Sequence, residues 1–444
     1  MTIRIRTPKL LAVTASVGVA TLALTGCGPA VGGTDTASEA VDFSGVTPAD
    51  SITFWTNHPG GSTDVEKQIT DAFTAETGIT VNIVTAGANY EEVSQKFQAA
   101  QGSNDIGDVV VVSDATWFTN YLNGSLLPVD DALAAAGADV STYQETLYND
   151  YLYEGAHFAA PYARSTPIFY YNKSQYSAAG LPDQAPATWD DVKANGEKLK
   201  AANAAASSFT FPPQDEYPAW TMANIVWAYG GNWSNEWDMS PMTSDATVEA
   251  VTFAQNGVKD GWANVASGDP ADDFAAGATS SFIGSTGSLG GLLETAQFEI
   301  GVGFLPGGPA GSDDVVPTGG AGLGISSKST PEKQLAAAKF IDFLTNAENT
   351  ATFSASTGYL PVRTDADMSE VYATTPAFEV AVKQLAKTRN QDFGRVLLPG
   401  GDLTISTALQ TILTTDADVK TTLQGAQDEM TSLYENDLKP RLGA

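Results

Sequence analysis

Residues 51–84 read SITFWTNHPGGSTDVEKQITDAFTAETGITVNIV, and this stretch decides the class of fold. Its first residues alternate apolar and polar side chains as a strand does, and the middle repeats apolar residues at helical spacing until Gly78. A second strand is expected at 79–84. A helix at 90–100 and an apolar run at 109–112 then repeat the order. Strand, helix, strand, helix, strand predicts an α/β fold built on a parallel sheet.

The same order of elements begins again at Pro167, which predicts a second α/β unit. A strand is expected at 168–171, and the run Thr188 to Asp191 resembles a capping box at the start of a helix. Thr330 with Pro331 is typical of another helix start, and the tail of the chain has helical apolar stripes. A chain of 444 residues, 43% of them hydrophobic, can form two or three domains with large cores.

The one cysteine of the chain, Cys27, follows a basic start and an apolar run at 10–23. That run is too short to span a bilayer comfortably as a permanent helix, so it predicts a signal peptide. The sequence Leu-Thr-Gly-Cys at 24–27 resembles the bacterial lipobox, in which the cysteine is lipid-modified and becomes the first residue. A buried structural cysteine is the alternative interpretation.

The leader and the residues after it define where the protein is expected to work. We predict a lipoprotein signal peptide at 1–26 and a flexible tether at 27–50, which is small, polar and aperiodic. The body after it would lie at the cell membrane on the extracytoplasmic face, anchored by lipid at Cys27. No second apolar run approaches the length of a membrane span.

The net charge excludes one class of partner. The formal charge of −30 becomes −33 when the basic residues of the leader are removed. Nucleic acids are bound through clustered Lys and Arg, so no nucleic-acid partner is expected. A solvated acidic surface is favoured over specific recognition of cations.

Residue patterns for catalysis and metal binding are missing from the chain. The two histidines, His58 and His157, have no partner that the sequence identifies, and there is no G-x-S-x-G motif. The glycine-rich run at 319–324 lacks the Lys-Ser/Thr ending of a phosphate loop. There is no H-E-x-x-H motif and no Cys/His cluster. We therefore expect no enzyme, no metal and no cofactor.

Aromatic and hydroxyl side chains stand at predicted loops and element ends. They are Tyr90, Ser165, Tyr217, Trp220, Ser285 and Tyr359. Aromatic faces cover the apolar side of a sugar or glycerol, and hydroxyls satisfy its polar groups, so this set predicts a polyol site. Each also has a packing interpretation: Trp220 and Trp227 are spaced as helix core, and Tyr90 could pack at a helix start.

Several stretches together resemble a known family. They are Ser165–Lys173, Ala187–Asp191, Gly284–Leu289, Gly301–Pro306, Thr318–Gly320, Lys339–Leu344 and Thr357–Val362. From Ser51 onward the chain is similar to the extracellular solute-binding proteins, family one, of ATP-driven importers. The similarity is strongest to the branch that binds glycerol 3-phosphate.

The resemblance implies a class II periplasmic-binding-protein-like fold with two α/β lobes and a ligand cleft between them. Residues 51–162 and 319–362 would form lobe 1, and residues 163–318 and 363–444 would form lobe 2. Closure of the lobes would signal the transmembrane permease subunits of an ABC transporter. The protein is expected to be a monomer.

The resemblance also implies a ligand site, carried over by position. Its residues are Tyr90, Asp114, Ser165, Tyr217, Ser285, Gly320, Tyr359 and Asp402. Two positions depart from the branch: Asp114 stands where it has a glutamate, and Asp402 stands where it has the arginine that pairs with phosphate. Arg395 lies near enough in sequence to substitute for that arginine. An aspartate there would favour a neutral sugar or a phosphodiester over a phosphate monoester.

The expected function is capture of a glycerol-3-phosphate, glycerophosphodiester or carbohydrate ligand for an ABC importer. One alternative is an exported glycan-cleaving enzyme that uses paired carboxylates such as Asp114 and Asp402. Another is an adhesive or structural surface lipoprotein. The first alternative predicts product release from an oligosaccharide, and the second predicts no closure on a small molecule.

Overall fold

The computed structural model describes residues 41–103 and 105–443. The predicted signal peptide at 1–26 and the lipidation site at Cys27 lie outside these residues. Within the described ranges, no helix has both the length and the apolar composition needed to cross a membrane.

The first sheet contains the strands predicted at the start of the chain. Its strands are β2 (Thr80–Thr85), β1 (Ser51–Thr56), β3 (Val109–Ser113), β13 (Gly319–Ser326) and β4 (Leu126–Leu127), in that order, with β7 (Ala160–Ser165) also paired to β13. The parallel pairing expected of β1, β2 and β3 is confirmed. The complete sheet is mixed, because β13 enters antiparallel to β3, β4 and β7 from a distant part of the chain.

Helices and aromatic side chains bury this sheet. Its main helices are α1 (Thr63–Thr77), α2 (Tyr90–Ala99), α13 (Pro331–Leu344) and α14 (Ala347–Thr357). Gly78 ends α1 in the left-handed conformation at φ 77°, which a glycine adopts without a steric penalty. Phe340 of α13 packs edge-on against Phe54 of β1 and Phe73 of α1. Strand β3 is buried along its whole length, as its apolar run predicted.

The second sheet is mixed, and its strands lie in the chain between β7 and β13 of the first sheet. Its strands are β10 (Ala263–Val265), β9 (Phe209–Phe211), β11 (Ser281–Ser285), β8 (Pro167–Asn172) and β12 (Ile300–Gly303), in that order. Strand β8 pairs antiparallel with β11 and β12, whereas β9 pairs parallel with β10 and β11. Helix α7 (Trp189–Ala201) starts at the predicted capping box, in which the Thr188 side chain accepts from the N–H of Asp191.

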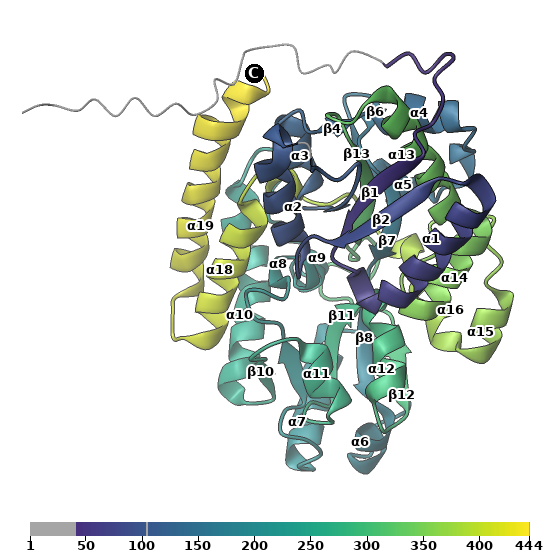
Figure 1. The fold of residues 1–444 in the computed structure, drawn as a ribbon. Helices are drawn as coiled ribbons and strands as arrows, with labels where there is room; N and C mark the ends of the chain where they lie inside the picture. The colour runs from purple at the N-terminus through teal and green to yellow at the C-terminus, as the bar shows by residue number, and fades with distance from the viewer. Residues whose placement is uncertain (1–40, 104, 444) are drawn as a thin grey trace, which may run out of the picture. The chain divides into compact units, whose positions relative to one another are not determined.

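The tail is helical, as predicted. Its helices are α15 (Ser369–Thr374), α16 (Pro376–Gln384), α17 (Phe393–Val396), α18 (Gly401–Thr414) and α19 (Val419–Leu433). Helices α18 and α19 lie side by side (Figure 1). The apolar stripe of α18 around Ile405 and Leu409 is buried, which explains why this helix packs against α8 (Pro218–Thr221) and α10 (Asp245–Asp260).

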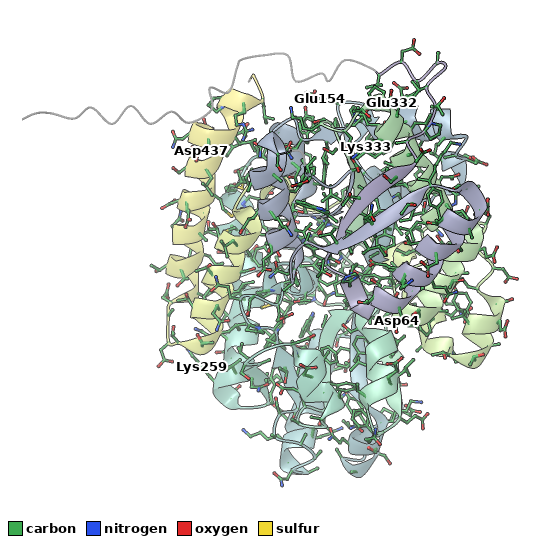
Figure 2. All side chains as sticks on the ribbon, viewed as in Figure 1. Asp64, Glu154, Lys259, Glu332, Lys333 and Asp437 are labelled. Atoms are coloured by element: carbon green, nitrogen blue, oxygen red, sulfur yellow. The ribbon has the colours of Figure 1, made fainter. Side chains whose placement is uncertain are left out.

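Shorter elements connect these units. They are α3 (Trp117–Leu122), α4 (Val129–Ala136), α5 (Glu145–Asn149), β5 (Leu152–Tyr153), β6 (Ala156–His157), α6 (Lys173–Ala178), α9 (Ala223–Ala228), α11 (Pro270–Ala275) and α12 (Leu289–Thr295). Charged side chains such as Asp64, Lys259 and Asp437 extend outward from the ribbon (Figure 2), and all three are exposed. The acidic side chains among them fit the solvated surface that the charge predicted.

The packed body begins before Ser51, where the sequence pattern placed its start. Val41, Phe43 and Ala49 pack against the core of the first sheet, and the Ala49 N–H donates to the carbonyl of Glu332 at 2.9 Å. Residues 41–50 of the predicted tether are therefore held against the body. Three apolar side chains and one backbone hydrogen bond account for the difference.

The chain passes from one sheet to the other at two crossings that matter for the site. Strand β7 ends at Ser165 in the first sheet, and β8 begins at Pro167 in the second. The return crossing joins β12 to β13, which begins at Gly319. The crossings bring polar strand ends from both sheets together.

Candidate ligand-binding site

All eight residues of the predicted ligand site line one cavity of about 100 Å³. We call it the central cavity. The predicted lining residues are Tyr90, Asp114, Ser165, Tyr217, Ser285, Gly320, Tyr359 and Asp402. Five more complete its wall: Glu91, Ser113, Ala115, Trp220 and Arg395. Residues separated by up to 312 positions thus meet at one place, although their contact with a ligand stays a prediction.

Strand ends and helix starts supply these side chains. Asp114 directly follows β3, and Ser165 and Ser285 are the last residues of β7 and β11. Tyr90 and Asp402 lie in the first turns of α2 and α18. Ligands of α/β proteins bind beyond the carboxyl ends of strands, because the backbone and side chains are free of the sheet there.

Gly320 shapes the backbone of the cavity wall. Its φ is +87°, and the pairing of β13 with β7 shifts register between Gly320 and Gly322. A Cβ atom on Gly320 would lie 2.1 Å from the carbonyl oxygen of Ala163, so only glycine fits this bulge. The Gly320 carbonyl accepts the N–H of Asp114 at 3.1 Å, which ties the bulge to the cavity carboxylate.

Arg395 lies between the two carboxylates of the central cavity, Asp114 and Asp402. Only 4% of it is exposed, and its Nη1 lies 2.8 Å from Oδ1 of Asp402. Its Nη2 contacts Oδ2 of Asp114, and its Nε donates to Oε1 of Gln391 at 3.0 Å. Gln391 in turn donates to Oδ2 of Asp114 at 2.9 Å. Arg395, which we considered as a substitute for the phosphate-binding arginine of the family, therefore lies in the same cavity and is paired with Asp402 and Asp114.

A second buried arginine lies behind the cavity wall. Arg164, immediately before Ser165, is fully buried and pairs with Asp150 and with the hydroxyl of Tyr151. Burial raises the pKa of Asp150, whereas Arg164 opposes that rise. Because both partners are held inside the protein, this pair supports the backbone at the crossing and does not face the ligand space.

Aromatic side chains form another part of the wall. The hydroxyls of Tyr90 and Tyr359 lie 3.3 Å apart, and the rings of Tyr90 and Tyr217 are 6.5 Å apart. Tyr217 has φ +56°, a strained conformation for a tyrosine of the kind that clusters at binding sites. Trp220 lines the cavity and donates Nε1–H to the carbonyl of Thr318 at 2.9 Å, whereas Trp227 is core.

Two larger cavities adjoin the central one. The first, of about 680 Å³, shares Tyr90, Tyr217, Trp220, Ser285 and Tyr359 with it. The charged lining residues of this first cavity are all carboxylates, Asp215, Glu216, Asp269 and Asp272, so we call it the acidic cavity.

The second cavity, of about 440 Å³, lies beyond Arg395, between α2 and α18. It shares Glu91, Ala115, Tyr217, Arg395 and Asp402 with the central cavity. The rest of its wall contains Asp215 and side chains that are mainly amides and hydroxyls, so we call it the amide cavity. The central cavity therefore has two neighbours of different chemistry.

Burial and mutual repulsion change the proton affinity of these carboxylates. Burial, followed by the charges of Asp269, Asp215 and Asp272, raises the pKa of Glu216 to about 7. Burial also raises the pKa of Asp402, with Arg395 opposing the rise. The sequence analysis did not include Glu91 and Glu216 among the site residues. Each directly neighbours a predicted site tyrosine, Tyr90 or Tyr217, and this position could have indicated them.

Both histidines have carboxylate partners, which the sequence had not identified. His58 Nδ1 lies 2.6 Å from Oε2 of the buried Glu66, and His157 Nδ1 lies 2.8 Å from Oδ1 of Asp130. The hydrogen bond to Glu66 raises the pKa of His58. The partners come from other elements, so their pairing could not be seen in the sequence. Among the described residues, no cluster of His, Cys, Asp and Glu could hold a metal ion.

Two sheets joined by crossing segments, with a polar and aromatic cavity at the crossings, define a binding protein of the two-lobe periplasmic class. Residues 68–380 match the family described as bacterial extracellular solute-binding protein, and the chain belongs to this family. It is the solute-binding component of an ABC importer, and proteins of this kind bind small ligands and deliver them to permeases.

The relatives give a more detailed comparison. The chain is 40% identical to UgpB from Mycobacterium tuberculosis, solved in complex with glycerophosphocholine, with a TM-score of 0.84 over 87% of this chain and 99% of that one. It is 27% identical over 353 residues to the sn-glycerol-3-phosphate-binding periplasmic protein UgpB of Escherichia coli K12, which covers 76% of this chain and 80% of the relative. The GacH receptor of Streptomyces glaucescens, at 19% identity, shares the fold, with a TM-score of 0.76 over 87% of this chain and 98% of that one.

Proposed function

We propose that this protein captures a glycerophosphodiester with a cationic headgroup, such as glycerophosphocholine, and delivers it to the permease. The proposal rests mainly on the charge of the central cavity and of the two larger cavities that adjoin it. Among the described residues that line them, Arg395 is the one basic side chain, whereas seven are acidic: Glu91, Asp114, Asp215, Glu216, Asp269, Asp272 and Asp402.

The charge balance favours a diester over a monoester. Arg395 is already paired with Asp114 and Asp402, so little positive charge remains for an incoming anion. A phosphate monoester brings close to two negative charges, and a diester brings one. A diester that also carries a quaternary ammonium has no net charge and avoids most of the repulsion.

The cavities offer a partner for each part of such a ligand. Hydroxyl groups of Ser113, Ser165 and Ser285 and the carboxylate of Asp114 suit the glycerol hydroxyls. The fork of Arg395 suits the phosphate. Carboxylates together with the rings of Tyr217 and Trp220 in the acidic cavity suit a quaternary ammonium, which binds to aromatic faces.

Lobe closure and lipid anchoring belong to the same proposal. Residues 51–162 with 319–362 would move against residues 163–318 with 363–444, and the two strand crossings would serve as hinges. The lipid on Cys27 would hold the protein at the extracytoplasmic face of the membrane. Cys27→Ser should release it to the soluble fraction, and a variant that stays lipid-labelled in the membrane pellet would contradict the anchor.

Calorimetry with the mature protein tests the ligand. Glycerophosphocholine should bind more tightly than glycerol 3-phosphate, and maltose should bind weakest. Arg395→Lys keeps the charge but loses the fork, so it should weaken glycerophosphocholine binding while the fold survives. Tighter binding of glycerol 3-phosphate than of the diester would refute the proposed preference.

A further inference from the structure

The turn at residues 57–61, directly after β1, forms part of the wall of the acidic cavity. The lining residues that it supplies are Asn57, Pro59, Gly60 and Gly61. The turn also stands close to Tyr359 and Gly287. A Cβ atom on Gly60 would lie 2.7 Å from Cε2 of the tyrosine and 3.1 Å from the carbonyl oxygen of the glycine. The position of this turn therefore affects the shape of the ligand space.

The backbone of the turn is unusual. His58 has φ +53°, and Gly60 and Gly61 have φ +63° and +72°. A histidine in the left-handed region costs free energy, so contacts outside the turn must stabilise it. His58 is also the one residue of the turn that does not line the acidic cavity. Its side chain contacts Glu66 of α1 instead.

Glu66 connects both ends of this turn. Its side chain is fully buried, and Oε1 accepts from the hydroxyls of Thr56 and Ser62, each at 3.0 Å. Thr56 directly precedes the turn and Ser62 directly follows it. The other oxygen, Oε2, lies 2.6 Å from Nδ1 of His58 inside the turn. The hydroxyl of Tyr162 donates to Oε1 at 2.9 Å, which ties the carboxylate to β7.

The ring of His58 is fixed at both nitrogens. Nε2 lies 2.8 Å from Oγ1 of Thr85, the last residue of β2, and the backbone N–H of His58 donates to Oγ1 of Thr56 at 2.9 Å. The ring is therefore held between α1 and β2. Loss of the ring would leave Oε2 of the buried Glu66 without this hydrogen bond, which costs free energy.

We infer that His58 and Glu66 are positioning residues for ligand binding, which hold the turn at 57–61 as a preformed wall of the ligand site. Neither side chain lines any of the three cavities, so both act through the backbone of the turn and not by contact with the ligand. A wall that is ordered before the ligand arrives raises affinity, because binding then loses less conformational entropy. The inference rests on the proposed function, since it concerns the affinity for a glycerophosphodiester.

Calorimetry with glycerophosphocholine tests this role. His58→Gly removes the ring and adds no backbone strain, because glycine tolerates a positive φ. Its affinity should fall about tenfold, since the turn is then ordered only when the ligand binds. His58→Asn keeps a donor near the position of Nδ1 and also tolerates this φ, so it should recover most of the affinity.

His157→Gly is the matched control. His157 also pairs with a carboxylate, that of Asp130 at 2.8 Å, and its ring stacks on Tyr148, but it lines none of the three cavities. Both glycine variants should lower the melting temperature, whereas only His58→Gly should lower the affinity. The comparison separates a loss of stability from a loss of positioning.

Thr85→Val decides the test if His58→Gly does not fold. Thr85 is exposed, and its loss leaves Nε2 of His58 without this partner, so the affinity should fall about threefold.

The outcomes separate this inference from the proposed function. If the wild type binds glycerophosphocholine and the folded variants bind it equally well, the positioning role is wrong and the proposed function stands. The same holds if His157→Gly loses as much affinity as His58→Gly. If the wild type does not bind glycerophosphocholine, the proposed function fails, and the positioning role fails with it.

Discussion

The backbone of Gly287 lies directly against the phenol ring of Tyr359. A Cβ atom on Gly287 would be 2.6 Å from Cζ of that ring, and one on Gly60 would be 2.7 Å from its Cε2. Gly60 belongs to a 3-10 turn near β1, and Gly287 belongs to a turn that follows β11. Tyr359 is therefore held between a segment next to the first sheet and a segment next to the second, at the wall of the central cavity.

Gly287→Ala should weaken ligand binding because the new methyl group would push the turn away from Tyr359. The φ of Gly287 is not positive, so alanine causes no backbone strain, and the effect should come from the contact alone. We expect about a tenfold loss of glycerophosphocholine affinity and a larger radius of gyration of the liganded protein in X-ray scattering.

Gly291→Ala is the matched control for this contact. Gly291 lines the same acidic cavity, but a Cβ atom there would meet nothing within 4 Å. This variant should bind and close normally. Normal binding and closure by Gly287→Ala would show that the contact with Tyr359 does not limit closure.

Asp402→Asn should raise the affinity for glycerol 3-phosphate. The change removes one negative charge and replaces the ion pair between Asp402 and Nη1 of Arg395 by a weaker neutral hydrogen bond, so more of the positive charge is available to the phosphate. We expect an increase of roughly tenfold, equivalent to about 1.4 kcal/mol, by calorimetry. Asp437→Asn makes the same charge change at an exposed position far along the chain and should have no effect (Figure 2). Equal affinities of the wild type and Asp402→Asn would mean that Asp402 does not set the preference.

Tyr217→Ala should reduce glycerophosphocholine affinity by about 1 to 3 kcal/mol, as truncation of an important aromatic contact does. Tyr217 lines all three cavities, so its ring lies beside every part of the proposed ligand. Tyr217→Phe keeps the ring and should retain most of the affinity. If the alanine variant binds as the wild type does, the tyrosine is a packing residue.

Glu216 should make stability and ligand affinity depend on pH in opposite directions. Its pKa is raised from 4.5 to about 7 in the folded protein, so folding favours the protonated form. The stability contribution is full below pH 4.5 and is lost as the pH rises through 7. Over the same range the carboxylate gains its charge, and the affinity for a cationic headgroup should rise.

Thermal melting and calorimetry between pH 5 and pH 8 measure both effects. Glu216→Gln should lessen the fall of the melting temperature and flatten the rise of glycerophosphocholine affinity. Glu154→Gln, at an exposed position, should leave both pH profiles unchanged. Unaltered profiles in Glu216→Gln would remove Glu216 as the titrating group.

The sequence by itself determined the local elements and the class of protein. The end of α1 at Gly78, the capping box at Thr188 and the buried strand at 109–112 depend on residues close together in the chain, so their patterns predicted them. The resemblance to the solute-binding family, carried over by position, likewise pointed to the eight residues that line the central cavity.

Only the tertiary structure decided which charges meet. Arg395 and Asp114 are 281 positions apart, and no spacing rule connects them before β3 and α17 are brought together. The antiparallel entry of β13 was not visible in the sequence for the same reason. Electrostatic energy depends on distance in space, so the balance that makes the cleft acidic around one arginine arises only when the chain is folded.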